Sequence, residues 1–183
     1  MSETLLFFRQ LISRPLQVSA IAPSSRFLAK AMAKDLGPNT GRVVEFGPGT
    51  GRLTEGILNA GVLPENLTLF EMNPDFVTHL RARFPGVTVH LAGAQTALDV
   101  VAKGVGAVVS GLPLLSMPMA LRQSIVAAAF DILAPDGIYV QFTYGPRPAL
   151  DGSQIASLGL SWIQTAYVAL NLPPARVHTF RKA

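Results

Sequence analysis

The stretch that constrains the fold most is residues 43–53, which read VVEFGPGTGRL. A short apolar run predicts a buried strand, three glycines at a spacing of two predict a tight turn, and a helical pattern follows. Glycine has no Cβ, so a loop of this kind lets a ligand approach the bare backbone. We therefore expect Gly47, Gly49 and Gly51 to form a binding loop between a strand and a helix.

The chain after Thr40 alternates short β-branched runs with longer helical patterns. Strands are expected at residues 42–46, 67–71, 87–91, 105–110 and 138–142, and helices at residues 53–59, 75–84, 96–103 and 119–133. This alternation predicts parallel βαβ units and a doubly wound, Rossmann-like α/β sheet. Residues 161–170 and 176–180 predict an antiparallel hairpin that closes the sheet edge and brings the number of strands to seven.

Composition limits the class of protein. A chain of 183 residues with 49% hydrophobic and 14% charged residues favours one well-buried domain and excludes disorder. The absence of cysteine excludes disulfides and thiolate metal sites, and no secretory signal is seen, so we expect a cytoplasmic protein without a metal. Two uncharged stretches are broken by proline, glycine and polar residues, which argues against a spanning helix. The net charge of +4 suits an anionic partner, either nucleic acid or a membrane surface.

Two acidic residues accompany the glycine loop. Glu71 stands twenty residues after Gly51, at the end of the second expected strand, where a carboxylate can accept hydrogen bonds from the ribose hydroxyls of an adenosine cofactor. Glu45 stands two residues before Gly47, and its carboxylate would repel a pyrophosphate. The glycine spacing G-x-G-x-G also differs from the dinucleotide pattern. A cofactor with a cationic group therefore fits this loop better than a dinucleotide.

The EFGPGTG stretch resembles the cofactor-binding motif of class I S-adenosylmethionine-dependent methyltransferases, and the resemblance extends over about residues 42–180. It implies that the glycines face the methionine portion of the cofactor, that Glu45 contacts its amino group and that Glu71 takes the ribose. An acidic residue often contacts adenine after the third strand of that family, and here Ala94 and Gln95 stand there. The cofactor-binding positions implied are Glu45, Gly47, Gly49, Gly51, Glu71, Met72, Ala94, Gln95 and Ser110.

The fourth expected strand ends in VVSGLPLLSMP, which looks like a divergent N-P-P-[YF] loop of amino-methylating enzymes. In base methylases the residue after the proline is aromatic and stacks on a flipped base. Here that residue is Leu114, which argues against a planar base and for an aliphatic amine, although an ordinary loop with core leucines is the alternative.

The segments SAIAPSSRFLAKAMA, VVEFGPGTG, VVSGLPLLSMP and QFTYGP occur in the order typical of soluble bacterial phospholipid N-methyltransferases, which this sequence resembles. That resemblance implies conversion of phosphatidylethanolamine to phosphatidylcholine in three methyl transfers. The first two segments also resemble ribosomal RNA adenine N6-dimethyltransferases, which generally carry an extra C-terminal helical domain for which this chain has no room. We expect a phospholipid substrate and no nucleic acid. A module without activity is a third hypothesis, which the intact glycine loop and its two glutamates disfavour.

The phospholipid amine is an ammonium at neutral pH and must lose a proton before it attacks a methyl group. Tyr144 is the first candidate to hydrogen-bond or deprotonate this amine, His178 is the second, and Ser110 is a possible positioning group. A lipid phosphate suits a bidentate cation, for which Arg147 and Arg26 are candidates.

The N-terminal segment, residues 1–36, precedes the expected methyltransferase domain of residues 37–183. At 100° per residue, the apolar side chains of residues 5–12 other than Leu6 share one arc, with polar and basic side chains opposite. A basic stripe at Arg26, Lys30 and Lys34 follows. Such a segment can lie on an anionic membrane surface, although it can also pack on the domain as a lid or dimer face. We expect a monomer at the inner face of the membrane. The candidate membrane contacts are Leu5, Phe7, Phe8, Arg9, Leu11, Ile12 and Arg14.

Overall fold

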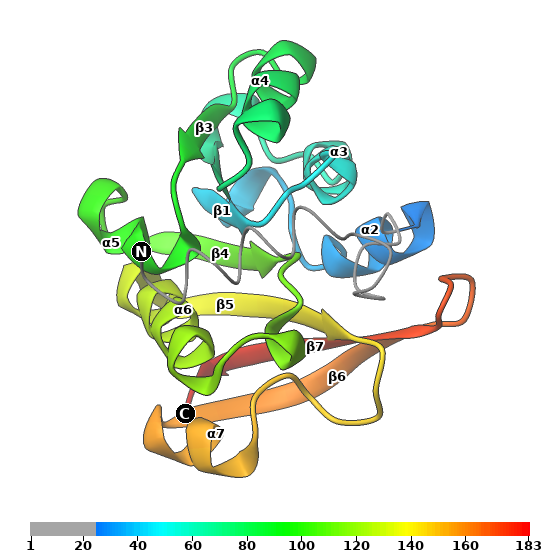
Figure 1. The fold of residues 1–183 in the computed structure, drawn as a ribbon, viewed down its shortest axis with the longest axis vertical. Helices are drawn as coiled ribbons and strands as arrows, with labels where there is room; N and C mark the ends of the chain where they lie inside the picture. The colour runs from blue at the N-terminus through cyan, green and yellow to red at the C-terminus, as the bar shows by residue number, and fades with distance from the viewer. Residues whose placement is uncertain (1–24) are drawn as a thin grey trace.

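The computed structural model describes residues 25–183, which contain one seven-stranded sheet in the order β3-β2-β1-β4-β5-β7-β6 (Figure 1). The strands are β1 (Val43–Phe46), β2 (Leu67–Glu71), β3 (Thr88–Leu91), β4 (Val105–Ser110), β5 (Leu133–Thr143), β6 (Leu160–Val168) and β7 (Ala175–Lys182). The first five run parallel, and β7 is antiparallel to both of its neighbours. The expected doubly wound fold with a C-terminal hairpin is confirmed, with β7 inside the sheet and β6 at its edge.

Helices cover both faces of the sheet (Figure 1). The helices are α2 (Arg26–Met32), α3 (Arg52–Asn59), α4 (Pro74–Arg83), α5 (Ala97–Val100), α6 (Met119–Ile132) and α7 (Gly152–Ser157). The first three pack on one face, which we call the α3 face, and the last three pack on the other, which we call the α6 face. None of the helices seen in residues 25–183 has the length and apolar character needed to cross a bilayer.

Each face has its own hydrophobic core, because successive side chains of a strand point to opposite sides. In β4, Ala107 and Val109 join the core under α2, α3 and α4, whereas Val105 and Val108 join the core under α5 and α6. Both faces of the central strands are covered, so strands such as β1 are buried at every position. This explains why β1 and β4 are continuous apolar runs in the sequence.

The helix α2 is integrated into the α3-face core. Ser25 caps it, with its hydroxyl oxygen accepting a hydrogen bond from the Leu28 amide at 3.2 Å. Leu28, Ala29 and Met32 are buried on its inner side, and Lys30 is exposed on its outer side. Residues 25–36 of the expected N-terminal segment therefore pack directly against the domain.

Most element boundaries differ from the expected ones by one or two residues, and the larger differences are at β5, α5 and α7. The helix α6 ends at Ile132 and β5 begins at Leu133, because Pro135 lacks an amide hydrogen and disfavours helix before it. The helix α5 is a single turn that follows a short 3₁₀ segment, Ala94–Thr96. The helix α7 was not expected, yet its start carries a capping box in which Asp151 accepts from the Gln154 amide and Gln154 accepts from the Asp151 amide.

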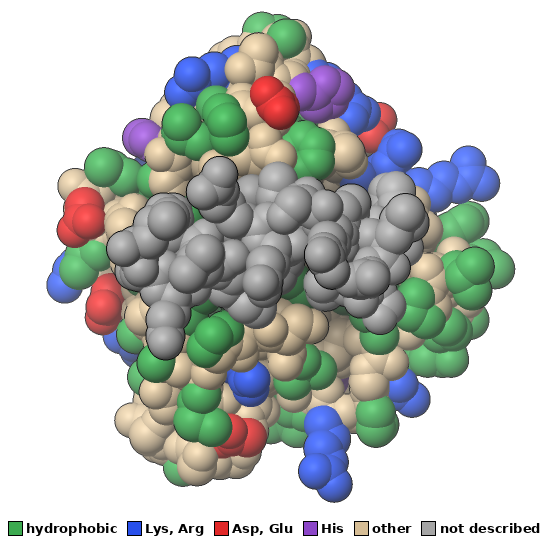
Figure 2. All heavy atoms as spheres, viewed as in Figure 1, with side chains coloured by type: hydrophobic (Ala, Val, Ile, Leu, Met, Phe, Trp, Pro, Cys, Tyr) green, Lys and Arg blue, Asp and Glu red, His purple; other side chains and the backbone are tan. Residues whose placement is uncertain are grey.

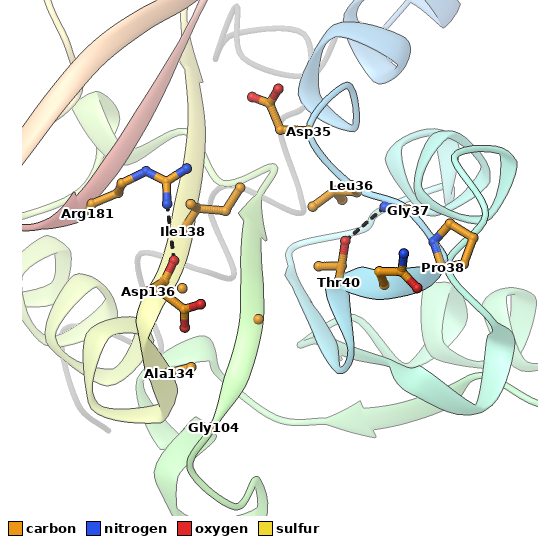
Figure 3. Close-up of a pocket in the computed structure, with 13 residues that line it drawn as sticks. Asp35, Leu36, Gly37, Pro38, Thr40, Gly104, Ala134, Asp136, Ile138 and Arg181 are labelled. Carbon is orange, nitrogen blue, oxygen red and sulfur yellow. Dashed lines mark hydrogen bonds between the residues drawn. The ribbon is translucent and has the colours of Figure 1, made fainter.

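A cavity of about 580 Å³ lies at the amino ends of the parallel strands, on the edge opposite the glycine loop (Figure 3). Thr40 before β1, Gly106 in β4 and Asp136 in β5 contribute to its lining, and the Arg181 guanidinium donates to the Asp136 carbonyl oxygen at 3.1 Å. Backbones approach very closely here, since a Cβ on Gly106 would overlap the carbonyl oxygen of Thr40. Gly106 is therefore required for the packing of β4 against the segment before β1.

We expect Gly106→Ala to lower the free energy of unfolding by about 1–3 kcal/mol, because the added methyl group must displace a backbone carbonyl. Chemical denaturation of both proteins measures this change. Gly152→Ala is the matched control, since nothing lies within 4 Å of a Cβ at that position. Equal destabilisation by the two substitutions would contradict the close approach at Gly106.

Candidate cofactor and methyl-transfer site

The glycine loop follows β1 at the carboxyl edge of the sheet. The Gly47 amide donates to the Phe70 carbonyl oxygen of β2 at 3.0 Å, and the Gly51 amide donates to Pro48 at 2.9 Å. Gly47, Gly49 and Gly51 all have positive φ, with values of 68°, 55° and 84°. The space that a Cβ on Gly49 would take has no neighbour within 4 Å. The expected strand–loop–helix unit is present, with bare backbone open at its centre.

The Glu71 carboxylate ties this loop to the end of β2. Its Oε2 accepts from the Gly49 amide at 3.1 Å, and its Oε1 accepts from the Met72 and Asn73 amides at 2.8 Å each. Three backbone donors occupy three of the approximately four acceptor positions of a carboxylate. A further position on Oε2 is left for a ligand hydroxyl group.

The Glu45 carboxylate is fully buried below the loop. Its Oε2 accepts from the Thr54 hydroxyl at 2.7 Å, and its Oε1 has no hydrogen-bond partner among the described residues. Burial raises the pKa of Glu45 to about 8, the Thr54 hydroxyl lowers it, and the charge of Glu71 raises it further. A cationic ligand group would supply the donor and the positive charge that this carboxylate lacks.

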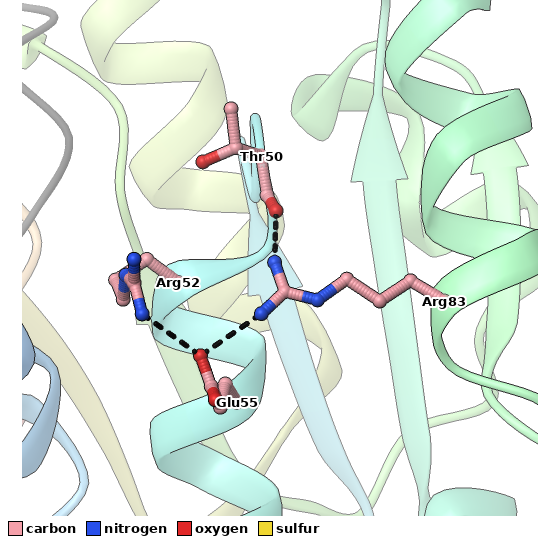
Figure 4. Close-up of polar contacts among 4 residues, drawn as sticks. All are labelled: Thr50, Arg52, Glu55 and Arg83. Carbon is pink, nitrogen blue, oxygen red and sulfur yellow. Dashed lines mark hydrogen bonds and ion pairs between the residues drawn. The ribbon is translucent and has the colours of Figure 1, made fainter.

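The loop is also held from α4 (Figure 4). The Arg83 guanidinium donates to the Thr50 carbonyl oxygen at 2.8 Å and pairs with Glu55 of α3 at 3.0 Å, and Arg52 pairs with the same Glu55 oxygen at 3.2 Å. These side chains are partly exposed, so the ion pairs contribute little to stability. Their effect is to fix the position of the loop relative to two helices.

The segment after β3 places two of the expected residues beside this edge. Ala94 is buried and Gln95 is half-buried, with a Gln95 Oε1 that lacks a partner among residues 25–183. An amide oxygen can accept a hydrogen bond from an adenine amino group. Met72, directly after Glu71, is half-buried on the same edge.

The loop after β4 contacts the glycine loop. The Gly111 amide donates to the Phe46 carbonyl oxygen at 2.8 Å, and a Cβ on Gly111 would come within 2.7 Å of the Gly47 carbonyl oxygen. Ser110 is fully buried, and its hydroxyl accepts from the Leu112 amide at 3.4 Å. Leu114 is 1% exposed and belongs to the α6-face core, so its side chain packs inside the protein.

Gln141 was not identified from the sequence, and it joins this loop to β5. Its Nε2 donates to the Leu112 carbonyl oxygen at 3.0 Å, and its Oε1 accepts from the Tyr139 hydroxyl at 2.8 Å. A polar residue within the apolar run of β5, directly opposite Ser110 in the parallel pairing, is the signal that could have identified it.

The candidate proton acceptors lie on opposite faces of the sheet. Tyr144 lies two residues after Phe142 and packs against the α3-face core, whereas His178 pairs in register with Gln141 and contacts Trp162. The Tyr144 phenol is half-buried, and burial raises its pKa while Asn171 opposes the rise. His178 is fully buried with both ring nitrogens unpartnered among the described residues, and burial and the Arg176 charge lower its pKa.

The remaining candidates lie at the surface or outside the described residues. Arg147 is exposed on the loop after Tyr144, and Arg26 is exposed on α2 with its guanidinium 4.9 Å from the Phe27 ring. The membrane contacts expected at Leu5, Phe7, Phe8, Arg9, Leu11, Ile12 and Arg14 lie outside the described residues, 25–183.

The residues at this edge fit S-adenosylmethionine. The unpartnered Glu45 oxygen suits its ammonium group, the remaining Glu71 position suits a ribose hydroxyl, the free Gln95 oxygen suits its adenine, and the open side of Gly49 admits it close to the backbone. When bound, this cofactor supplies an electrophilic methyl group on a sulfonium centre.

Comparison with solved structures shows that this fold is shared with methyltransferases. The 1,6-didemethyltoxoflavin N1-methyltransferase of Burkholderia thailandensis, solved with S-adenosylhomocysteine, matches with a TM-score of 0.73 and 14% identity over 98% of this chain and 88% of that one. A glycopeptide N-methyltransferase complexed with S-adenosylmethionine matches with a TM-score of 0.65 and 18% identity over 89% and 96% of the two chains. The fold is therefore that of the class I methyltransferases, and the residues of the site fit S-adenosylmethionine as the cofactor.

Comparison with the sequences of known proteins shows the family to which the chain belongs. The chain is 30% identical over 154 residues to an ornithine lipid N-methyltransferase of Singulisphaera acidiphila, with 80% of each chain covered. No protein-family model matches the chain. The protein belongs to the family of that methyltransferase.

We expect Glu71→Ala to weaken the binding of S-adenosylhomocysteine by at least about tenfold, because a hydrogen bond to a charged acceptor is lost. Calorimetry with the 2′-deoxy and 3′-deoxy analogues separates ribose contact from loop support. At least one analogue should bind the wild-type protein more weakly, and the variant should not distinguish it from the parent ligand. An equal loss of affinity for the deoxy analogue in the wild-type protein and in Glu71→Ala would exclude the ribose contact.

The raised pKa of Glu45 predicts a pH-dependent stability. Between the ordinary pKa of 4.5 and about 8, the folded protein holds a proton that the unfolded chain releases, so stability falls as pH rises through this window. The slope from this group is up to about 1.4 kcal/mol per pH unit. Denaturation of the ligand-free protein at several pH values should show a smaller slope for Glu45→Gln, and identical slopes would contradict the shift.

Proposed function

We propose that the protein N-methylates phosphatidylethanolamine and its mono- and dimethyl derivatives to give phosphatidylcholine at a membrane surface. The observation that carries the proposal is the relation to an ornithine lipid N-methyltransferase over 80% of both chains, because that enzyme acts on the nitrogen of a lipid. The phospholipid motifs of the sequence favour phosphatidylethanolamine as the substrate.

The loop after β4 supports an aliphatic amine as the acceptor. Leu114 stands where base-methylating enzymes have a stacking aromatic residue, and its side chain is packed in the core. The adjacent Leu112 is aliphatic as well. A site without this stacking residue favours a flexible amine over the planar base of the alternative RNA adenine N6-dimethyltransferase reaction.

The chain's part in the reaction is to bind the amine, orient it and favour its neutral form. The nitrogen must lose its proton before its lone pair can attack the methyl group, and positioning supplies much of the rate. Because burial raises its pKa, Tyr144 is a neutral phenol at neutral pH, and its oxygen has no hydrogen-bond partner among the described residues. That oxygen can accept a hydrogen bond from the amine and orient its lone pair, while the ammonium proton is released to solvent before the attack. We assign the attraction of the lipid phosphate to Arg147, on the same loop, and to Arg26, both of which are exposed.

Two other polar groups have supporting roles in this proposal. The lowered pKa keeps His178 neutral and able to accept a proton, but its complete burial separates it from the solvent. We assign it to the inner wall of the site, behind Gln141. Ser110, which accepts from the Leu112 amide, positions the loop that faces the amine.

The relative favours ornithine lipid as a second candidate substrate. Ornithine lipid and phosphatidylethanolamine share the chemistry that the site has to recognise, an aliphatic amine on a membrane-bound molecule. Both substrates require the protein to work at a bilayer, which agrees with the amphipathic segment that contains Phe7 and Phe8. We propose that this segment contributes to attachment at the inner face of the membrane.

The expected result of incubating the purified protein with S-adenosylmethionine and phosphatidylethanolamine vesicles is a set of lipids heavier by one, two and three methyl groups. Lipid mass spectrometry measures them, and parallel vesicles with ornithine lipid rank the two substrates. Tyr144→Phe keeps the ring and should lower kcat at least about 100-fold with cofactor affinity unchanged. If a cofactor-binding protein methylates neither lipid but does methylate RNA, the proposal is wrong.

A further inference from the structure

The turn between β6 and β7 lies at the same edge of the sheet as the cofactor site. Thr143, the last residue of β5, pairs with Arg176 at the start of β7, and Val168 of β6 pairs with Ala175. Residues 169–174 therefore extend beyond the carboxyl end of β5. In Figure 1 the turn projects on the side toward which the arrows of β4 and β5 point, beside α2.

The turn exposes two large apolar side chains on a fixed backbone. Leu170 is 70% exposed and Leu172 is 86% exposed, while Asn171 between them is 4% exposed. The Asn171 Oδ1 accepts from the Ser25 amide at 3.0 Å, and its Nδ2 donates to the Pro173 carbonyl oxygen at 2.8 Å. Asn171 thus anchors the turn to the start of α2 and leaves both leucines facing outward.

Aromatic side chains with basic partners extend this apolar area. Tyr167 of β6 is 55% exposed, with the Arg176 guanidinium 5.0 Å from its ring centroid, and Phe27 of α2 is 40% exposed beside Arg26. Figure 2 shows hydrophobic side chains gathered at the end of the molecule where the hairpin turn projects, with Lys and Arg side chains nearby. The surface is therefore both apolar and basic.

The charged side chains of α2 and of the β6–β7 hairpin are all basic. Residues 152–183 contain no aspartate or glutamate, and neither do residues 25–34. Lys30 is exposed on α2, and Lys34 bridges to β6 by donating to the Thr165 carbonyl oxygen at 2.8 Å. An anionic partner would meet no repulsion on either element.

We propose that this surface docks on an anionic lipid bilayer, with the leucines among the acyl chains and the basic side chains among the headgroups. The proposal rests on the proposed function, since a lipid substrate requires such contact. A nucleic acid would neutralise the basic residues but leave the exposed leucines uncovered, whereas a bilayer interface accommodates both. The docking surface consists of Leu170, Leu172, Tyr167, Phe27, Arg26, Lys30 and Arg176.

Docking in this manner orients the methyl-transfer site. The turn and the glycine loop share one edge of the sheet, so insertion of the turn brings that edge toward the headgroups. The lipid amine can then reach the site while its acyl chains stay in the bilayer.

The test compares the full chain with Leu170→Ser/Leu172→Ser on phosphatidylethanolamine vesicles that contain phosphatidylglycerol. The partition coefficient from vesicle sedimentation should fall at least about tenfold, because two apolar side chains no longer leave water. Methylation in vesicles should fall in parallel, and methylation of monomeric short-chain phosphatidylethanolamine should be unchanged. Leu63→Ser is the matched control, since Leu63 is 50% exposed before the amino end of β2 and should behave as wild type.

An unchanged partition coefficient of the leucine variant would overturn the proposal, and a loss only in Phe7→Ser/Phe8→Ser would assign the attachment to the N-terminal segment instead. A wild-type dimer that becomes monomeric in the leucine variant, by light scattering, with vesicle binding intact would assign the surface to a second copy of the chain. If wild-type protein methylates neither form of the lipid, the proposed function fails, while sedimentation still decides the docking.

Discussion

The site depends on one carboxylate that accepts backbone hydrogen bonds from two loops. Glu71 receives the amide of Gly49 from the loop after β1 and the amides of Met72 and Asn73 from the turn after β2. Hydrogen bonds to an ionised acceptor are short and strong, so the ends of two neighbouring strands are fixed to each other. The glycines of the loop adopt positive φ because they have no Cβ, and this contact and the Arg83 contact hold the loop at both sides.

The sheet divides the polar groups into two sets that meet only at its carboxyl edge. Glu45 and Tyr144 belong to the α3 face, and Ser110, Gln141 and His178 belong to the α6 face. The cofactor-binding groups are concentrated on the first side and around the glycine loop, whereas Gln141 and Ser110 hold the loop after β4 from the second. A substrate amine between them would therefore be positioned by two independently packed cores.

Much of the fold could be predicted from local patterns. The strands β2 and β4 have the expected bounds, and the glycine loop, the order of the βαβ units and the antiparallel hairpin follow from periodicity and turn residues. The early start of β5 could not be predicted because Leu133 pairs with Val105 across a register shift whose extra residues are in β5, and this pairing is a tertiary contact. The placement of β7 inside the sheet is also a tertiary outcome.

The residue types at the candidate site could be inferred from the sequence, but the burial and the hydrogen-bond partners of those residues could not. Spacing alone indicated Glu45 and Glu71, yet the raised pKa of Glu45 arises from burial under α3, which the hydroxyl of Thr54 offsets only in part. The burial of His178 could not be inferred, because β7 is buried at most positions and its sequence does not alternate cleanly. Leu114 likewise gave no sign of which side of its loop it would occupy.

The position of β7 has a consequence for how the chain acquires its structure during synthesis. The strand β6 is made before β7, yet its hydrogen-bonding partner in the sheet is β7 rather than any earlier strand. Until β7 has been made, β6 has no edge on which to pair, and apolar residues such as Trp162 and Ile163 remain on an unpaired segment. The synthesis of β7 thus decides when the hairpin joins the domain, and pairing of this kind is a late and aggregation-sensitive step of folding.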